Sequence, residues 1–471
     1  MSKKSPRWLL ALVGLGWIWG GGAAAYASDG DLDPSFWGDG RFYANSLVFP
    51  GTYQGGEVVL APDGKLVWVG TVDDPVTLEL ENALYWKTLT DSQGGAPCIV
   101  TNPTVGVDVT EMLVSDAVFD SSGRLLLAGT EYSTTFTRRI WAARFLYPAC
   151  TLDLSFSTNG WGFHGAADTA LSDLALDAQD RIFIVGDAHG LGFYQYVLKR
   201  LSIDSLIEQA SIASLFGASS ASFATALELS GGKVVVAGRT LLGGDWDMVV
   251  ARFDAANLSL DPTFAGDGVL IFGWYDDGSS CEDSSDFLRS IDIDPNSGQI
   301  ALGGSTSCNV AGSLQPAVAV LNSIGSFDSW FDGDGTRRFA FVDDPDADGG
   351  VSQVVWQSDG KLLAAGSTLD ELGSDFEMAV ARFQPDGAFD PGFGDGSLLG
   401  DGTTEVAFDL GGNMADNANS SILQGGKVIL GGLARDADGS MRPAVARLSN
   451  RLIFSDGFGS GLTSSWSSTV P

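Results

Sequence analysis

A stretch of seven residues occurs seven times along the chain and restricts its fold more than any other feature. Its clearest copy is Gly360-Lys361-Leu362-Leu363-Ala364-Ala365-Gly366, in which a turn leads into an apolar strand that is expected to stop at the second glycine. The other copies begin at Gly64, Gly123, Asp180, Gly232, Gly298 and Gly426, and successive copies start 52 to 66 residues apart. A period near 60 residues predicts one array of repeated units rather than several independent domains.

Two further sequence boxes accompany this hairpin in a fixed order. A turn box rich in Asp, Phe and Gly occurs at 31–40, 152–160, 260–268, 327–335 and 389–396. An apolar box similar to MAVARF lies at 84–89, 141–146, 196–201, 248–253, 316–321, 378–383 and 443–448. With a strand before each hairpin turn, one after it, one in the apolar box and one after the turn box, each unit is predicted to contain four strands.

The strands that follow the hairpin turns are unbroken apolar runs, such as Val234-Val235-Val236-Ala237. An unbroken run indicates burial on both faces, which neighbouring blades of a propeller provide. A buried helix is the alternative for so short a run, but glycines bound these segments. With 44% hydrophobic residues and 62 glycines, the chain is predicted to be all-β, a seven-bladed β-propeller of four-stranded blades.

The two ends of the array predict how the ring closes. The seventh unit ends at Leu448 without a turn box, whereas the chain has a turn box near its start that no hairpin precedes. The N-terminal box and strand, roughly 32–44, can therefore complete the last unit, which leaves no exposed sheet edge at the junction. The propeller is expected to span residues 28–450.

These boxes together resemble a known family. The order of LDPSF or LDPTF with GDG, then QSDGKLLAAG at 357–366 and MAVARFQPDG at 378–387, is similar to the delta-60 repeat family of bacterial exported proteins. The resemblance covers roughly residues 31–450, with worn or missing boxes at 94–103 and 206–217. It implies a propeller-like repeat protein and brings no established catalytic residues.

The chain ends point to export. Residues 1–27 have a basic start, an apolar run and the sequence Ala25-Tyr26-Ala27, as in a secretory signal peptide cleaved before Ser28. An uncleaved anchor is the alternative, but the apolar run is short for a membrane span. The mature protein is expected in the periplasm or outside the cell, and residues 451–471 form a predicted flexible tail.

The formal net charge of −33 bears on possible partners. Such a surface repels nucleic-acid phosphates and anionic membranes and attracts cations, so neither nucleic-acid binding nor membrane insertion is expected. That the charge only keeps an exported protein soluble is favoured over a dedicated cationic partner. We expect a monomer that binds an unidentified protein or glycan.

Four cysteines in an oxidising compartment predict disulfide bonds, with three possible pairings. Metal binding is the rival interpretation, but the chain has no C-x-x-C spacing and two histidines. Cys281 and Cys308 flank one hairpin, and Cys98 and Cys150 occupy matching places in units 1 and 2. We therefore predict the pairs Cys281 with Cys308 and Cys98 with Cys150.

One acidic loop resembles the start of a calcium-binding loop. Asp344, Asp346 and Asp348 alternate before a glycine, an arrangement that can wrap carboxylate oxygens around a hard cation. Val355 stands where the distal glutamate would be, and a solvated acidic loop is the equal alternative. Calcium is the one cofactor that the sequence suggests.

No catalytic set stands out in the sequence. There is no G-x-S-x-G motif, and the two histidines offer little material for a Ser-His-Asp triad. Trp246 and Trp274 lie between predicted strands and are candidates for a ligand surface, while Trp37, Trp161 and Trp330 lie in or beside turn boxes and are expected to pack internally.

Two functions remain open from the sequence. The first is a non-catalytic propeller that acts as a binding or surface-interaction scaffold. The second is a calcium-dependent propeller hydrolase acting on an ester, lactone or glycan. Carboxylates that converge on a metal in the central channel would favour the hydrolase, and an acidic rim without convergence would favour the scaffold.

Overall fold

The structure is a computed structural model. It describes residues 29–44, 52–73, 83–100, 109–135, 137–164, 168–190, 193–213, 221–242, 244–274, 286–307, 314–344, 347–370, 373, 375–394, 402–411 and 415–450. The predicted signal peptide and C-terminal tail lie outside these residues.

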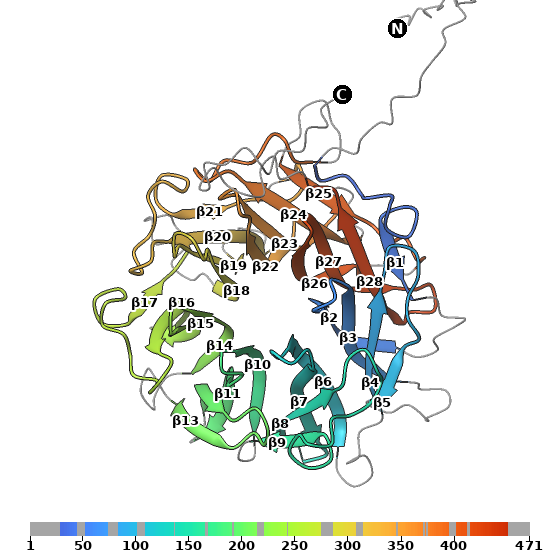
Figure 1. The fold of residues 1–471 in the computed structure, drawn as a ribbon. Helices are drawn as coiled ribbons and strands as arrows, with labels where there is room; N and C mark the ends of the chain where they lie inside the picture. The colour runs from blue at the N-terminus through green and yellow to red at the C-terminus, as the bar shows by residue number, and fades with distance from the viewer. Residues whose placement is uncertain are drawn as a thin grey trace, which may run out of the picture.

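Seven four-stranded antiparallel sheets surround a central channel, which confirms the predicted seven-bladed propeller (Figure 1). Blade 1 contains β2 (Thr52–Leu60), β3 (Leu66–Asp73), β4 (Ala83–Leu89) and β5 (Cys98–Val100). Blade 2 contains β6 (Val109–Phe119), β7 (Leu125–Ser133), β8 (Arg138–Phe145) and β9 (Trp161–His164). Blade 3 contains β10 (Thr169–Leu176), β11 (Ile182–Gly190), β12 (Phe193–Leu201) and β13 (Glu208–Ala213).

The remaining blades follow the same order. Blade 4 contains β14 (Ser222–Ser230), β15 (Lys233–Leu242), β16 (Asp245–Asp254) and β17 (Val269–Phe272). Blade 5 contains β18 (Asp286–Ile293), β19 (Ile300–Thr306), β20 (Gln315–Leu321) and β21 (Thr336–Arg338). Blade 6 contains β22 (Gly349–Trp356), β23 (Leu362–Leu369), β24 (Phe376–Phe383) and β25 (Thr403–Val406). Blade 7 contains β26 (Asn417–Gln424), β27 (Lys427–Arg435), β28 (Met441–Leu448) and β1 (Arg41–Tyr43).

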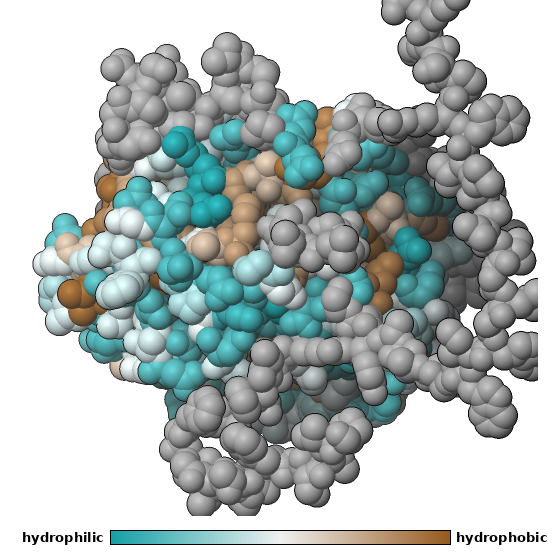
Figure 2. All heavy atoms as spheres, turned by 90° about the horizontal axis from the view of Figure 1, so that it is seen from above, coloured by the Kyte–Doolittle hydropathy of each residue, from teal (hydrophilic) through white to brown (hydrophobic). Residues whose placement is uncertain are grey.

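The core lies between neighbouring blades. The second and third strands of each blade are buried almost throughout, and one apolar cluster joins Leu302 of β19 to Val250 of β16 in the preceding blade. The apolar runs of the hairpin box are therefore buried on both faces, as predicted. On the side of the ring seen in Figure 2, the described surface is largely hydrophilic, with hydrophobic residues in separate patches. No helix among the described residues is long and apolar enough to cross a membrane.

The N-terminal strand closes the ring, as predicted. β1 pairs antiparallel with β28, with Phe42 opposite Val445, and the two elements lie side by side at the rim (Figure 1). Gly30 N donates a hydrogen bond to Ser449 O at 2.8 Å. Both ends of the array are thus joined through backbone hydrogen bonds of a single blade.

The three sequence boxes meet at one buried ion-pair cluster in blade 6. Arg382 of the apolar box lies 2.7 Å from Asp390 of the turn box, and Lys361 of the hairpin lies 2.9 Å from the same carboxylate. The Arg382 guanidinium covers the ring of Phe393, the buried aromatic of the turn box, at 4.6 Å. Related clusters form around Asp33, Asp153 and Asp261. The boxes recur together because their charged residues bind one another.

The two glycines of the hairpin box have different roles. Gly360 has φ of 82°, a left-handed turn conformation that glycine adopts without strain. Asp180 replaces glycine at this position in blade 3 and keeps φ of 56°, and its carboxylate accepts a hydrogen bond from Ser121 N at 2.9 Å. Gly366 does not end its strand as expected, because β23 continues to Leu369. A side chain at Gly366 would meet the carbonyl oxygen of Gly350 at 1.9 Å, so the glycine permits close approach of the innermost strand.

Candidate functional site

Every innermost strand carries a β-bulge at the same level of the channel. In β22 the register shifts between Val351 and Gln353, which leaves Ser352 as the extra residue. The same irregularity occurs in β2, β6, β10, β14, β18 and β26. The residues at the bulges are Gly55 and Gly56, Ser115, Ser172, Thr225, Arg289, Ser352 and Asn419. A bulge re-aims a side chain, and here it turns one position per blade toward the axis.

These residues line a central cavity of about 610 Å³. The cavity wall also contains the residue that follows each bulge, among them Glu57, Asp116 and Asp173. Two smaller cavities adjoin it at the end of the channel where the innermost strands begin, and we call this end the channel mouth. Arg289, Ser352 and Asn419 line all three cavities.

The side chains after the bulges bind each blade to the next. Leu174 N donates to Asp116 Oδ2 at 2.8 Å, and Leu227 N donates to Asp173 Oδ2 at 2.7 Å. A hydroxyl group accepts the equivalent hydrogen bond between blades 7 and 1, where Val58 N donates to Ser420 Oγ at 2.9 Å. The bulge leaves a backbone N–H without its ladder partner, and the neighbouring blade supplies the acceptor.

Burial shifts the ionisation of the channel carboxyls. Burial raises the pKa of Glu57 to about 8 and, together with the charges of Asp292 and Asp173, that of Glu228 to about 8. The pKa values of Asp116 and Asp173 are also raised well above the usual range, first by burial and then by neighbouring carboxyls. Hydrogen bonds from backbone N–H groups oppose these shifts without cancelling them. The channel wall therefore favours neutral carboxyls near neutral pH.

The predicted calcium loop is only partly described. Asp346 lies outside the described residues. Asp348 Oδ1 accepts a hydrogen bond from Leu314 N at 2.9 Å, and Asp344 O accepts one from Ala347 N at 3.1 Å. Among the described residues no three His, Cys, Asp or Glu side chains form a group that could hold a metal ion. Calcium binding at this loop stays a prediction.

The tryptophan predictions divide. Trp246 lies near the channel mouth, where its ring faces Phe223 at 5.5 Å. Trp274 is 4% exposed and packs edge-on against Phe272, and it lines a cavity of about 390 Å³ beside Phe327. A role for Trp246 or Trp274 in ligand binding stays a prediction. Trp330 was expected to pack internally and is instead 82% exposed. Position in a loop or turn box did not reveal which way these rings face.

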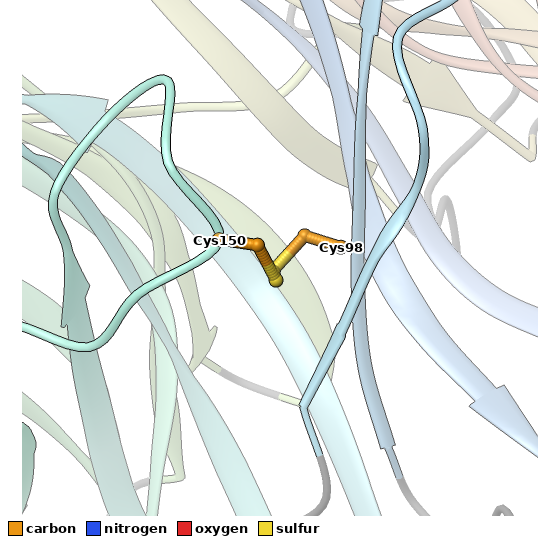
Figure 3. The surroundings of a disulfide bond; sticks show 2 residues. All are labelled: Cys98 and Cys150. Carbon is orange, nitrogen blue, oxygen red and sulfur yellow. A yellow bond between two sulfur atoms is a disulfide. The ribbon is translucent and has the colours of Figure 1, made fainter.

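One of the two expected disulfide bonds is present in the described residues. Cys98 of β5 is bonded to Cys150, which lies in the turn after β8, so the bond joins blades 1 and 2 (Figure 3). The Cα atoms are 5.3 Å apart. Cys281 and Cys308 lie outside the described residues, and their pairing stays a prediction.

Sequence reasoning missed the bulge residues. They vary among glycine, serine, threonine, arginine and asparagine, so they do not belong to any recurring box. A polar pair in the middle of most innermost strands, such as Ser172-Asp173 or Ser352-Gln353, was the available signal. In a strand that is otherwise buried, two successive polar residues break both the alternating and the unbroken apolar pattern.

Comparison with known proteins supports the architecture. Residues 230–264 and 357–393 match a family described as "Domain of unknown function (DUF5122) beta-propeller". These segments cover the hairpin, the apolar box and the turn box of blades 4 and 6, which is less than half of the chain. No curated protein matches the sequence.

Several solved structures resemble the fold at low sequence identity. The polysaccharide lyase Uly1 is 9% identical, with a TM-score of 0.49 over 87% of this chain and 91% of that chain. An ulvan lyase of family PL25 is 8% identical, with a TM-score of 0.48 over 85% and 94%. Drosophila Semaphorin 1a is 12% identical, with a TM-score of 0.44 over 86% and 87%. Likenesses this weak carry no inference about activity or ligand. The blades and the matching segments together identify the chain as a β-propeller repeat protein.

Proposed function

We propose that this protein is an exported binding propeller that takes a small polar ligand into its central channel. The ring of bulge side chains is the observation that carries this proposal. A propeller that served only as a scaffold would need the recurring boxes, which build the blades, and nothing more. The channel instead presents a polar bulge side chain from six of the seven blades, of four residue types, around a cavity of about 610 Å³.

The hydrolase alternative is less well supported by the channel. A calcium-dependent hydrolase would need carboxylates that converge on a metal. Glu57, Asp116 and Asp173 line the channel, but Asp116 and Asp173 each accept a backbone N–H from the next blade, and burial raises the pKa of Glu57 to about 8. Asp116 and Asp173 therefore hold neighbouring blades together, and no group of three among the described residues could hold a metal.

We further propose that the chain belongs to the delta-60 repeat family and that residues 1–27 direct its export. The fixed order of the three boxes supports the first proposal. The basic start, apolar run and Ala25-Tyr26-Ala27 site support the second. Detection of a mature N-terminus at Ser28 in an exported fraction would test it.

Filling the channel tests the binding function. Ser352 lines all three cavities, so Ser352→Trp places a bulky side chain in the space that a ligand would occupy. Ser323→Trp, at an exposed turn after β20, is the matched control. A panel of neutral and charged saccharides and organic acids is screened by calorimetry against wild type and both variants.

The expected result is a compound that binds wild type and Ser323→Trp and loses its binding in Ser352→Trp. Equal binding to all three proteins would place the ligand outside the channel. No binding across the whole panel would contradict a small-molecule function and favour a surface partner.

A further inference from the structure

Arg289 is a cation at the channel mouth that has no partner among the described residues. It occupies the bulge of β18, and its exposed side chain lines all three cavities. In the described part of the chain its guanidinium makes no hydrogen bond or ion pair. The arginines of the ion-pair clusters, such as Arg382 and Arg252, are instead bound to turn-box aspartates. A guanidinium has five N–H donors, so Arg289 offers an unused donor fork to the cavity.

A second cation lies beside Arg289. The Arg239 guanidinium sits among three aromatic rings, 4.6 Å from both Trp246 and Phe287 and 5.2 Å from Phe223. Burial lowers the pKa of Arg239, and the charge of Arg289 lowers it further. The two guanidinium groups are thus close enough to repel each other. A bound anion would relieve this repulsion, and the positive potential would draw it to the mouth.

The acidic side chains of the channel do not neutralise these charges. Burial raises the pKa of Glu57, Asp116 and Asp173, so these carboxyls carry less negative charge near neutral pH than their number suggests. Asp116 and Asp173 also accept backbone N–H groups of the next blade. Asp348 lines the cavity nearest the mouth, where its Oδ1 accepts a hydrogen bond from Leu314 N at 2.9 Å, and among the described residues it forms no ion pair with Arg289.

Neutral polar groups surround Arg289. The described residues that line a cavity of about 330 Å³ are Arg289, Ser172, Thr225, Ser352 and Asn419. The hydroxyl groups of Ser172 and Ser352 have no hydrogen-bond partner in the described part of the chain. Each can therefore donate one hydrogen bond and accept others, as the hydroxyl groups of a polyol require.

We propose that the channel mouth binds a polyhydroxylated anion, with Arg289 holding its carboxylate or sulfate and the surrounding hydroxyl and amide side chains binding its hydroxyl groups. This inference rests on the proposed binding function and specifies its ligand class. Carboxylate and sulfate both present paired oxygens that match the fork of a guanidinium. Trp246 contacts the second cation, since the Arg239 guanidinium lies 4.6 Å from the centre of its ring.

Three probes and three variants test the inference. Glucuronate, glucose 6-sulfate and glucose are titrated at equal ionic strength, which separates a carboxylate, a sulfate and a neutral polyol. The variants are Arg289→Gln, Arg289→Lys and Arg435→Gln. Arg435 is an exposed arginine at the end of β27, so its variant makes the same charge change away from the channel. Arg289 forms no hydrogen bond or ion pair with the described part of the chain, so Arg289→Gln should keep the melting temperature of the wild type.

One or both acidic probes should bind wild type and Arg435→Gln, and glucose should bind at least tenfold more weakly. Arg289→Gln should lower the affinity for the acidic probe at least tenfold. The affinity of Arg289→Lys should lie between those of the wild type and Arg289→Gln, because lysine keeps the charge and lacks the planar fork. Binding should also weaken as salt is raised from 50 to about 300 mM. The preferred acidic probe identifies the anionic group.

Two results would overturn the inference. Glucose binding that equals glucuronate binding and is unchanged in Arg289→Gln would show that charge is not recognised, while leaving channel binding intact. Failure of both acidic probes to bind wild type would exclude this ligand class. The Ser352→Trp screen then decides separately whether the channel binds anything at all.

Discussion

Replacing Arg382 with leucine should destabilise the propeller by about 3 kcal/mol. The Arg382 side chain is 2% exposed, and its guanidinium contacts Asp390 at 2.7 Å, Asp29 at 3.0 Å and the Phe393 ring at 4.6 Å. Breaking a buried ion pair by removing one partner costs about 3–5 kcal/mol, because a buried charge loses its compensation. Lys361 stays 2.9 Å from Asp390, so the carboxylate keeps one cation and the cost falls at the lower end.

Equilibrium unfolding in urea, followed by circular dichroism and tryptophan fluorescence, measures this loss. Lys65→Met is the matched control, because Lys65 has the same place in the hairpin of blade 1 as Lys361 has in blade 6. Lys65 pairs only with the exposed Asp63 of its own turn, and exposed ion pairs contribute little. The urea midpoint of Lys65→Met should therefore stay near that of the wild type.

Arg382→Lys separates charge from geometry. A lysine keeps the positive charge but cannot contact Asp390 and Asp29 with a planar fork. The unfolding free energy of Arg382→Lys should therefore lie between those of the wild type and Arg382→Leu. Unfolding of Arg382→Leu at the wild-type midpoint, with an unchanged slope, would refute the view that this cluster stabilises the blade.

Four further outcomes are expected. Deleting residues 31–44 should lower the stability of the whole ring, because the deletion removes β1 from blade 7; an unchanged unfolding transition would contradict closure by this segment. A Cys98→Ser and Cys150→Ser double variant should lose about 2–4 kcal/mol in denaturant unfolding, since the bond closes a loop of 52 residues; equal stability would assign it no role. The unfolding free energy of the wild type should fall as pH rises from about 4.5 to about 8, because the folded state keeps the proton of Glu57 that the unfolded chain loses. Glu57→Gln should reduce the slope of unfolding free energy against pH by about 1.4 kcal/mol per pH unit, and an identical slope would count against the raised pKa. Calcium should raise the melting temperature of wild type and not of Asp346→Ala, and no shift in wild type would reject the loop as a calcium site.

The recurring boxes were sufficient to predict the architecture, because they encode contacts that every blade needs. Lys361, Arg382 and Asp390 come from three different boxes and form one cluster in blade 6. Because the hairpin, the apolar box and the turn box must meet in this cluster, their order and spacing along the sequence are restricted. The fold could therefore be inferred from sequence even in blades 1 and 3, whose worn boxes still lead to the fourth strands β5 and β13.

Blade 5 shows that the cluster can change its chemistry. Val320 occupies the place of the arginine in its apolar box, and Gln299 replaces the hairpin lysine. The Gln299 side-chain amide donates a hydrogen bond to Asp328 Oδ2. A neutral donor thus replaces two cations, which explains why the box pattern PAVAVL could diverge without loss of the blade.

The channel could not be predicted in the same way, because its side chains are the positions at which the blades differ. Ser352, Asn419 and Arg289 share a place in the fold and no residue type. The one recurring sequence position that is related to the channel is the second glycine of the hairpin box. Gly366 was interpreted as the end of a strand, whereas it makes room for a carbonyl at 1.9 Å from where its Cβ would be, beside the bulge of β22. The glycine that recurs in every blade thus marks the bulge: it pairs with the residue just before the bulge, as Gly366 pairs with Val351, and the bulge residue that follows, here Ser352, supplies the chemistry of the channel.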